Sequence, residues 1–181
     1  PRDRGAAGWR DRLQRDLLER FQQANERAPL DLALLYVSHF ECSRATLEAI
    51  QAAGVPAAVL CWDDKHSFRE RHVGWPNGQE PLVGAATVHL TSSVECISWY
   101  ASRGAAAYYF PEAADPQVYR NLALDQDIPV SFIGGWYGGR RELIGNVRRA
   151  GIDVHCWGPG TEGGIVSRDE MVRIYNRSHV N

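Results

Sequence analysis

The sequence of 181 residues has little net charge, no long apolar run and few cysteines. Its 20 basic and 22 acidic residues give a formal net charge of −2, which argues against nucleic-acid or membrane-surface binding, since those functions usually need a basic patch. No apolar run approaches the ~20 residues that cross a bilayer. The charged N-terminal segment has no apolar stretch either, so we expect no secretory signal and a cytoplasmic protein.

The four cysteines, Cys42, Cys61, Cys96 and Cys156, lie far apart and form no CxxC pair. This spacing does not fit the ligand patterns of structural zinc sites. We therefore expect reduced, partly buried thiols and no metal.

Apolar runs alternate with amphipathic segments along most of the chain, after an Arg-rich helix expected over residues 8–27. The expected strands are 30–38, 55–62, 86–92, 105–111, 128–135 and 152–158, and the further expected helices are 44–54, 94–104, 140–151 and 167–180. Such alternation is typical of parallel sheets covered by helices on both faces. The sequence therefore predicts an α/β fold with Rossmann-like parallel sheets and flanking helices.

Two polar segments interrupt this series. Residues 63–84 form a long insertion, and long loops in α/β folds are often functional. Residues 111–127, rich in Pro and Asp, resemble a connection between two halves. The predicted organisation is an N-terminal helix (1–30), a Rossmann-like domain (31–115), a linker (116–127) and the first part of a second Rossmann-like domain (128–181).

The turn GGWYGG joins the strand expected at 128–135 to the helix expected at 140–151. Ligands of open α/β sheets bind at this edge, where glycines let bare N–H groups approach an anion and the helix dipole favours negative charge. Two arginines in the first turn of the helix are unfavourable unless an anion lies nearby. The predicted phosphate-binding residues are Gly134, Gly135, Gly138, Gly139, Arg140 and Arg141. A glycine-rich turn with solvated arginines is the alternative, because neither the dinucleotide fingerprint nor the P-loop motif is present.

Polar residues also follow the first two strands. Asp63 and Asp64 come at the end of the second strand, where carboxylates can bind hydroxyls or act as acid or base. His39 follows the first strand and is a candidate base, because imidazoles titrate near neutral pH. The structural alternatives are a charged loop in which Asp64 caps the next helical turn, and a His39 that only hydrogen-bonds its loop.

A second glycine-rich loop, WGPGTEGGIVS (157–167), leaves the strand expected at 152–158. Ser167 followed by Asp169 and Glu170 predicts a helix N-cap with an acidic first turn. We therefore interpret this loop as structural.

Several of these segments together resemble the spore-maturation-type family of bacterial glycosyltransferase-like proteins. The segments are LCWDDKHSF, YYFPEAADPQVY, FIGGWYGGRRELI, VHCWGPG and SRDEMVRIYNRSHVN, and the resemblance covers roughly residues 31–181. It implies the two-Rossmann-domain (GT-B-like) architecture without a structural metal. In that architecture the first domain binds the acceptor, the second binds a nucleoside diphosphate sugar, and the cleft between them holds the reaction.

The resemblance implies that the Gly134–Gly139 turn and the two arginines face the donor diphosphate, with no cofactor beyond the donor substrate. We assign Asp63, Asp64 and His39 to the acceptor side. Proteins of the family continue with further βα units, whereas only about 55 residues follow Ile128 here, fewer than the ~100 of a usual domain. We therefore expect a fragment, or a chain completed by another domain or by self-association. The alternative to a glycosyltransferase is a non-catalytic nucleotide- or sugar-binding module.

Overall fold

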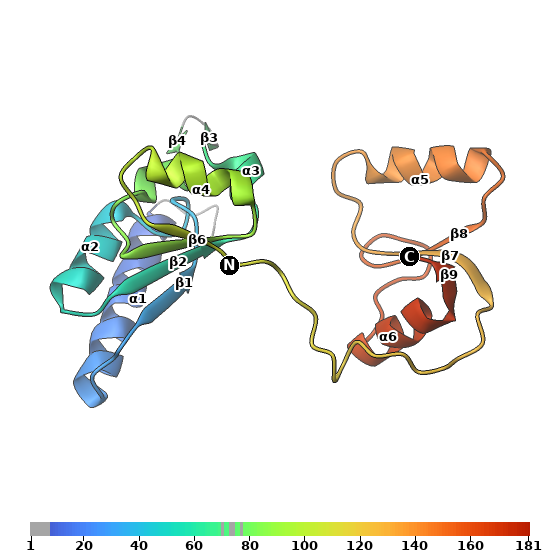
Figure 1. Cartoon of the computed structure of the whole chain (residues 1–181), viewed down its shortest axis with the longest axis horizontal. Helices are drawn as coiled ribbons and strands as arrows, with labels where there is room; N and C mark the ends of the chain where they lie inside the picture. The colour runs from blue at the N-terminus through green and yellow to red at the C-terminus, as the bar shows by residue number, and fades with distance from the viewer. Residues whose placement is uncertain (1–7, 70, 73–74, 77) are drawn as a thin grey trace. The chain divides into compact units, whose positions relative to one another are not determined.

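The computed structural model describes residues 8–69, 71–72, 75–76 and 78–181. The chain divides into two compact units, the first ending at Glu112 and the second running from Ala113 to Asn181. Each unit contains parallel strands flanked by helices, which confirms the predicted Rossmann-like α/β fold (Figure 1). None of the helices in these ranges has the length and apolarity needed to cross a membrane.

The first unit contains all the strands and helices expected between residues 8 and 111, with shorter ends. Its elements are α1 (Trp9–Arg27), β1 (Ala33–Tyr36), α2 (Arg44–Ala52), β2 (Ala57–Cys61), α3 (Asp64–Ser67), β3 (Arg71–His72), β4 (Trp75–Pro76), the 3-10 helix η1 (Glu80–Leu82), β5 (Val88–Thr91), α4 (Val94–Ala101) and β6 (Ala107–Tyr109). The polar insertion thus holds a short helix, a small hairpin and η1. Its residues 70, 73–74 and 77 lie outside the described residues, as does the charged segment 1–7.

The main sheet of this unit has the strand order β1-β2-β5-β6, with all neighbours parallel. The chain therefore moves across the sheet in one direction, and right-handed crossovers then place every connecting helix on the same face. Packing agrees with this rule. Val59 lies in one apolar cluster with Leu47 of α2, and His89, its neighbour in register, stacks on Tyr100 of α4 at 4.5 Å between ring centroids.

The opposite face of this sheet is open. Leu34, Tyr36 and Tyr108 point to it and keep 62%, 61% and 65% of their surface exposed. The described helices pack against the other face, so the expectation of cover on both faces is wrong for this unit. The apolar runs suggested two-sided burial, but the order of the strands decides on which side the helices lie.

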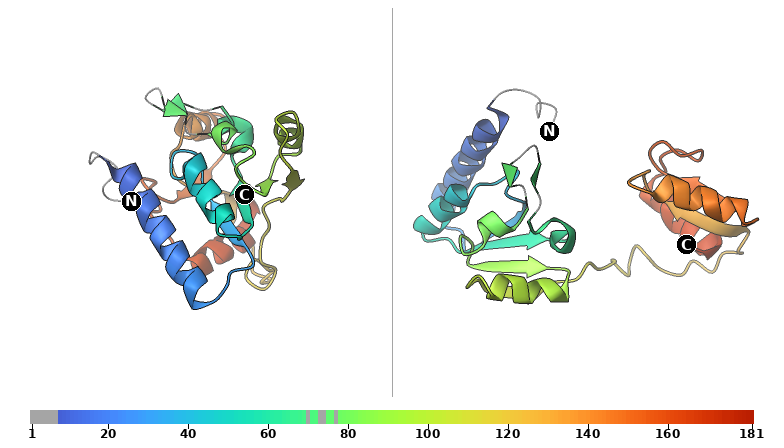
Figure 2. Two further views of the ribbon diagram at one scale, coloured as in Figure 1. Left: turned by 90° about the vertical axis from the view of Figure 1, so that its left-hand side faces the viewer. Right: turned by 90° about the horizontal axis from the view of Figure 1, so that it is seen from above.

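α1 covers the helical layer rather than the sheet. Leu17, Leu18 and Phe21 of α1 pack on the apolar cluster that α2 forms with β1 and β2. Figure 2 shows α1 and α2 side by side in both of its views. The predicted amphipathic helix therefore docks on the first unit as its apolar spacing indicated.

A polar cluster lies buried between the sheet and α4. Asp64 is 0% exposed, and one of its carboxylate oxygens accepts a hydrogen bond from the Tyr100 hydroxyl at 3.2 Å. The thiol of Cys96 lies beside the same carboxylate, and burial followed by this negative charge raises the Cys96 pKa to about 12. His89 is also fully buried, and burial lowers its pKa to about 4. Neither of its ring nitrogens has a hydrogen-bond partner within the described ranges.

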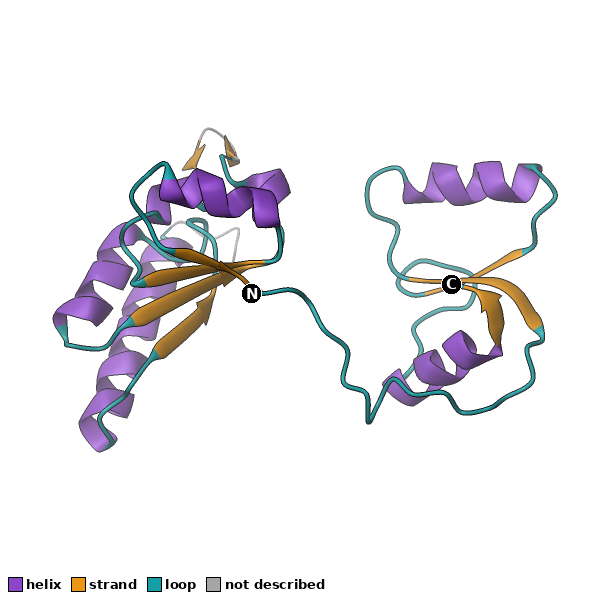
Figure 3. Cartoon of the chain, viewed as in Figure 1, coloured by secondary structure: helices purple, strands orange, loops and turns teal. Residues whose placement is uncertain are grey.

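The second unit is a doubly wound sheet of three strands. Its elements are β7 (Ile128–Ile133), α5 (Arg140–Arg149), β8 (Val154–Trp157), α6 (Arg168–Arg177) and β9 (Ser178–Val180). The strand order is β8-β7-β9, all parallel. The crossover through α5 runs in one direction and that through α6 in the other, so the two helices cover opposite faces (Figure 3). The two-sided cover predicted from sequence is present here.

The predicted N-cap of the last helix is confirmed, because Ser167 Oγ accepts a hydrogen bond from the backbone N–H of Glu170 at 3.2 Å. The expected end of this helix is wrong. It stops at Arg177, and residues 178–180 form β9, in which Ser178 and Val180 pair with Ile128 and Val130. Strand pairing with β7 therefore overrides the helical pattern over the last three residues.

The segment expected to be a linker is partly fastened to α6 and β9. Asn176 of α6 accepts a hydrogen bond from the backbone of Leu122 and donates one to the carbonyl of Arg120. Asp127 forms a bidentate ion pair with Arg177, at 2.6 and 2.7 Å. Residues 120–127 thus belong to the second unit, where side chains of α6 hold them through hydrogen bonds and an ion pair.

The buried His89 makes stability depend on pH. Its folded pKa of about 4 lies below the ordinary 6.5, so the unfolded state binds a proton that the folded state excludes. The His89 contribution is therefore complete above pH 6.5 and is lost as the pH falls towards 4. Urea unfolding should give a stability about 2 kcal/mol lower at pH 5 than at pH 7.

The variant His89→Phe, which keeps a ring for stacking on Tyr100, should lose most of this difference. An equally large drop between pH 7 and pH 5 in the variant would show that other groups cause it.

Candidate functional site

The two glycine-rich loops of the second unit meet beyond the ends of β7 and β8. Gly134 donates its backbone N–H to the carbonyl of Trp157 at 2.7 Å, and the Trp136 indole donates to the carbonyl of Gly160 at 2.9 Å. At Gly158 a Cβ would lie 2.4 Å from the carbonyl oxygen of Gly134, so only glycine fits there. From this contact the chain continues to α5 on one face and to α6 on the other. Such a divergence is where open α/β sheets bind ligands.

The outer half of the GGWYGG turn is open. A Cβ built on Gly138 or Gly139 would meet no atom within 4 Å. The backbone N–H groups of these two glycines and of Arg141 donate no hydrogen bond to any residue in the described ranges. Unpaired donors at a helix start, together with the helix dipole, form an anion-binding surface.

The two arginines of the first turn of α5 differ. The Arg140 guanidinium donates to the carbonyl of Gly135 at 3.3 Å and lies 5.4 Å from the centre of the Tyr137 ring. It therefore helps to hold the loop in shape. The exposed Arg141 side chain makes no hydrogen bond or ion pair with the residues that the structure describes. Of the pair, Arg141 is the one available to an incoming anion.

The three predicted acceptor-side residues lie in the first unit, and the structure separates them by exposure. His39 and Asp63 follow the neighbouring parallel strands β1 and β2, so both lie at the carboxyl edge of the sheet. His39 is half-buried, and its backbone N–H donates to the carbonyl of Gly78 at 3.1 Å. Asp63 is exposed, whereas Asp64 faces inward to Tyr100. Asp64 does not cap α3, whose N-cap is Asp63 without a side-chain bond.

Aromatic rings border the exposed Asp63. Tyr36 packs on Trp62 with 5.1 Å between ring centroids. Partial desolvation raises the pKa of the largely exposed Tyr36 hydroxyl, and the Asp63 carboxylate raises it further. The carboxyl edge of the first sheet therefore presents an acid and a histidine with aromatic side chains beside them.

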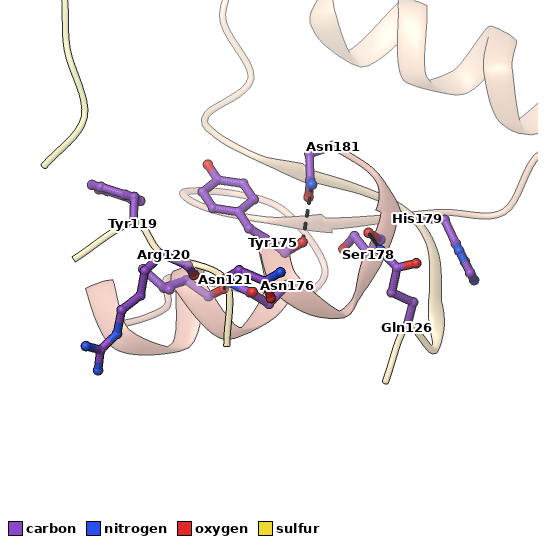
Figure 4. A pocket seen from close by; sticks show the side chains of 10 residues that line it. Tyr119, Arg120, Asn121, Gln126, Tyr175, Asn176, Ser178, His179 and Asn181 are labelled. Carbon is purple, nitrogen blue, oxygen red and sulfur yellow. Dashed lines mark hydrogen bonds between the residues drawn. The ribbon is translucent and has the colours of Figure 1, made fainter. Parts of the chain in front are cut away.

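A pocket of about 480 Å³ beside α6 was not predicted from the sequence. Figure 4 shows Tyr119 and Arg120 at one end of it and His179 at the other. Its lining residues are Tyr119, Arg120, Asn121, Gln126, Val172, Tyr175, Asn176, Ser178, His179 and Asn181. The signal that could have found it is the clustering of Tyr, Asn and Arg in YRN (119–121) and YNR (175–177).

A second hollow of about 440 Å³ adjoins the last half of β7. It is lined by Ser131, Phe132, Ile133, Tyr175 and Asn181, so it shares two residues with the pocket beside α6. The Ser131 hydroxyl donates to the Asn181 side chain at 2.5 Å, which ties β7 to the residue after β9. Phe132, which lines this hollow, stacks on Trp136 of the glycine-rich turn with 5.8 Å between ring centroids, so the hollow lies next to the turn.

No protein-family model matches the chain, and no curated protein is recognisably similar to it. Within the described ranges, no group of three His, Cys, Asp or Glu side chains could hold a metal ion. The four cysteines are buried free thiols.

The two loops give a matched pair of glycine substitutions. Gly158 has φ +130° and no room for a Cβ, so Gly158→Ala should destabilise the second unit by roughly 1–3 kcal/mol or more. Gly139 has φ −81° and open space beside it, so Gly139→Ala should change the stability little. Calorimetric unfolding of the full chain measures both, and equal effects of the two substitutions would contradict the loop contact.

Proposed function

We propose that the glycine-rich turn 134–139 binds the diphosphate of a nucleoside diphosphate sugar, and that the chain belongs to a glycosyltransferase. One observation carries this proposal: the open start of α5, with unpaired backbone N–H groups next to the free cation of Arg141. Anionic oxygens are the ligands that such a site favours. The choice of a nucleoside diphosphate sugar as this anion rests on the family resemblance noted from the sequence.

The hollow beside β7 supports this assignment, because it offers space next to the turn for the rest of the donor. Its lining combines the rings of Phe132 and Tyr175 with the polar side chains of Ser131 and Asn181. Apolar walls with a few polar groups are typical of small-molecule sites.

In a transfer reaction the acceptor hydroxyl attacks the anomeric carbon and the bond from that carbon to the diphosphate oxygen breaks. Arg141 and the turn's N–H groups would stabilise the negative charge that develops on the leaving diphosphate. Asp63 and His39 are the candidates for the base that takes the hydroxyl proton. Asp64 is sealed from solvent, so its role would be to hold Tyr100 and α4 in place.

A non-catalytic binding module is the second candidate. The burial of Asp64 favours it, because only one of the two adjacent carboxylates is exposed at the sheet edge. Both candidates require the phosphate site, and they differ in whether a bound donor is consumed.

Replacing Arg141 tests the phosphate site. A thermal-shift screen with uridine, guanosine, thymidine and adenosine diphosphate sugars first identifies the donor that raises the unfolding midpoint. Calorimetric titration should then show at least tenfold weaker binding to Arg141→Ala, because a charge-assisted phosphate contact contributes about 1.5–3 kcal/mol.

The matched control is Arg173→Ala, which removes an exposed arginine of α6 from the same unit. Unchanged affinity in Arg141→Ala, or an equal loss in the control, would refute the assignment. An assay for free nucleotide then distinguishes the two candidate functions, because only an enzyme releases nucleotide from the donor.

A further inference from the structure

A groove in the first unit, between α3 and α4, has a lining of unusual composition. Its volume is about 510 Å³. Three of the lining residues carry a permanent positive charge, one is a histidine and two are aromatic; they are Lys65, Arg69, Arg103, His66, Phe68 and Trp99. No acidic residue lines the groove in the part of the chain that the structure describes. All of these residues belong to the first unit, and neither His39 nor Asp63 is among them.

Among the described residues, two acids, Glu80 and Glu95, pair with the cations of this groove. Glu80 uses one carboxylate oxygen to accept hydrogen bonds from both Arg103, at 2.6 and 3.0 Å, and Arg69, at 2.9 Å. Glu95 pairs with Lys65 at 2.7 Å, and both of these side chains are about half exposed. Three cations therefore share two carboxylates, and exposed pairs of this kind are weak.

Arg69 is the cation most available to a ligand. Its side chain is 70% exposed, whereas that of Arg103 is 24% exposed and lies over the Phe68 ring at 5.0 Å. Because Arg103 alone makes two hydrogen bonds to Glu80, that carboxylate stays paired when Arg69 turns away. An incoming anion can thus pair with Arg69 while Glu80 keeps its ion pair with Arg103.

Trp99 supplies a ring surface and a free donor in the same groove. Its ring meets Phe68 edge-on, with 5.5 Å between centroids and 68° between planes. Neither the indole N–H of Trp99 nor the ring of His66 forms a hydrogen bond to any residue in the described ranges. Tryptophan with adjacent cations favours a ligand whose ring stacks while its charge is paired.

We propose that this groove binds a small ligand that carries a ring next to an anionic group, with the ring on Trp99 and the anion on Arg69. The anion can be the carboxylate of an acidic sugar or the phosphate of a nucleoside monophosphate. The two sources share the chemistry that the groove recognises, and binding measurements distinguish them.

Calorimetric titration of the full chain with glucuronic acid and uridine monophosphate, against neutral glucose and uridine, tests this site. We expect at least one anion to bind, with at least tenfold weaker binding of its neutral counterpart and weakening by added salt. Tighter binding of glucuronic acid identifies an acidic-sugar site, and tighter binding of the monophosphate a nucleotide site.

Two variants locate the binding. Trp99→Ala and Arg69→Ala should each weaken it at least tenfold, and the exposed Arg69 keeps the test valid if Trp99→Ala fails to fold. Arg20→Ala on α1 is the control for loss of one surface charge. The proposal is overturned if neither anion binds, if the neutral ligands bind equally well, or if Arg69→Ala has no effect. A loss in Arg141→Ala alone would assign the binding to the second unit and also overturn it.

Discussion

The right-handedness of the crossover between parallel strands is the constraint on which both units depend. In the first unit the order β1-β2-β5-β6 advances in one direction, so the helices gather on one face and leave Leu34, Tyr36 and Tyr108 exposed on the other. In the second unit β7 lies between β8 and β9, so the same rule sends α5 and α6 to opposite faces. The loops that follow β7 and β8 touch at Gly134 and Gly158, and beyond this contact the chain leads to α5 on one face and to α6 on the other.

The glycines of the two loops serve different physical needs. Position 158 must be glycine, because its backbone lies against the carbonyl of Gly134 and leaves no room for a Cβ. Gly138 and Gly139 have open space beside them, so contact explains neither of them. One loop thus fixes the position of the other, and the free half of the turn presents N–H groups beside Arg141. Preorganised donors of this kind are favourable for holding an anion because little rearrangement opposes binding.

Most of the fold could be predicted from the sequence, since the strands are apolar runs and the helices between them have amphipathic spacing. Two helices, α2 and α6, also begin at a serine cap. Ser167 is the best example, because its capping bond to Glu170 forms as the local pattern indicates. The open face of the first sheet could not be predicted, because strand order is a long-range property that Leu34 and Tyr36 do not encode locally. The burial of Asp64 was equally hidden, since it depends on Tyr100, which is 36 positions away. β9 was missed because pairing with β7 decides the conformation of residues 178–180.

The most direct test of the phosphate site is an amide-resolved NMR titration of the full chain with a nucleoside diphosphate. We expect the largest shifts at the N–H groups of Gly138, Gly139 and Arg141, with smaller changes at Ser131 and Tyr175 beside the neighbouring hollow. Saturating shifts elsewhere in the chain, with these three amides unmoved, would contradict a diphosphate site at the start of α5.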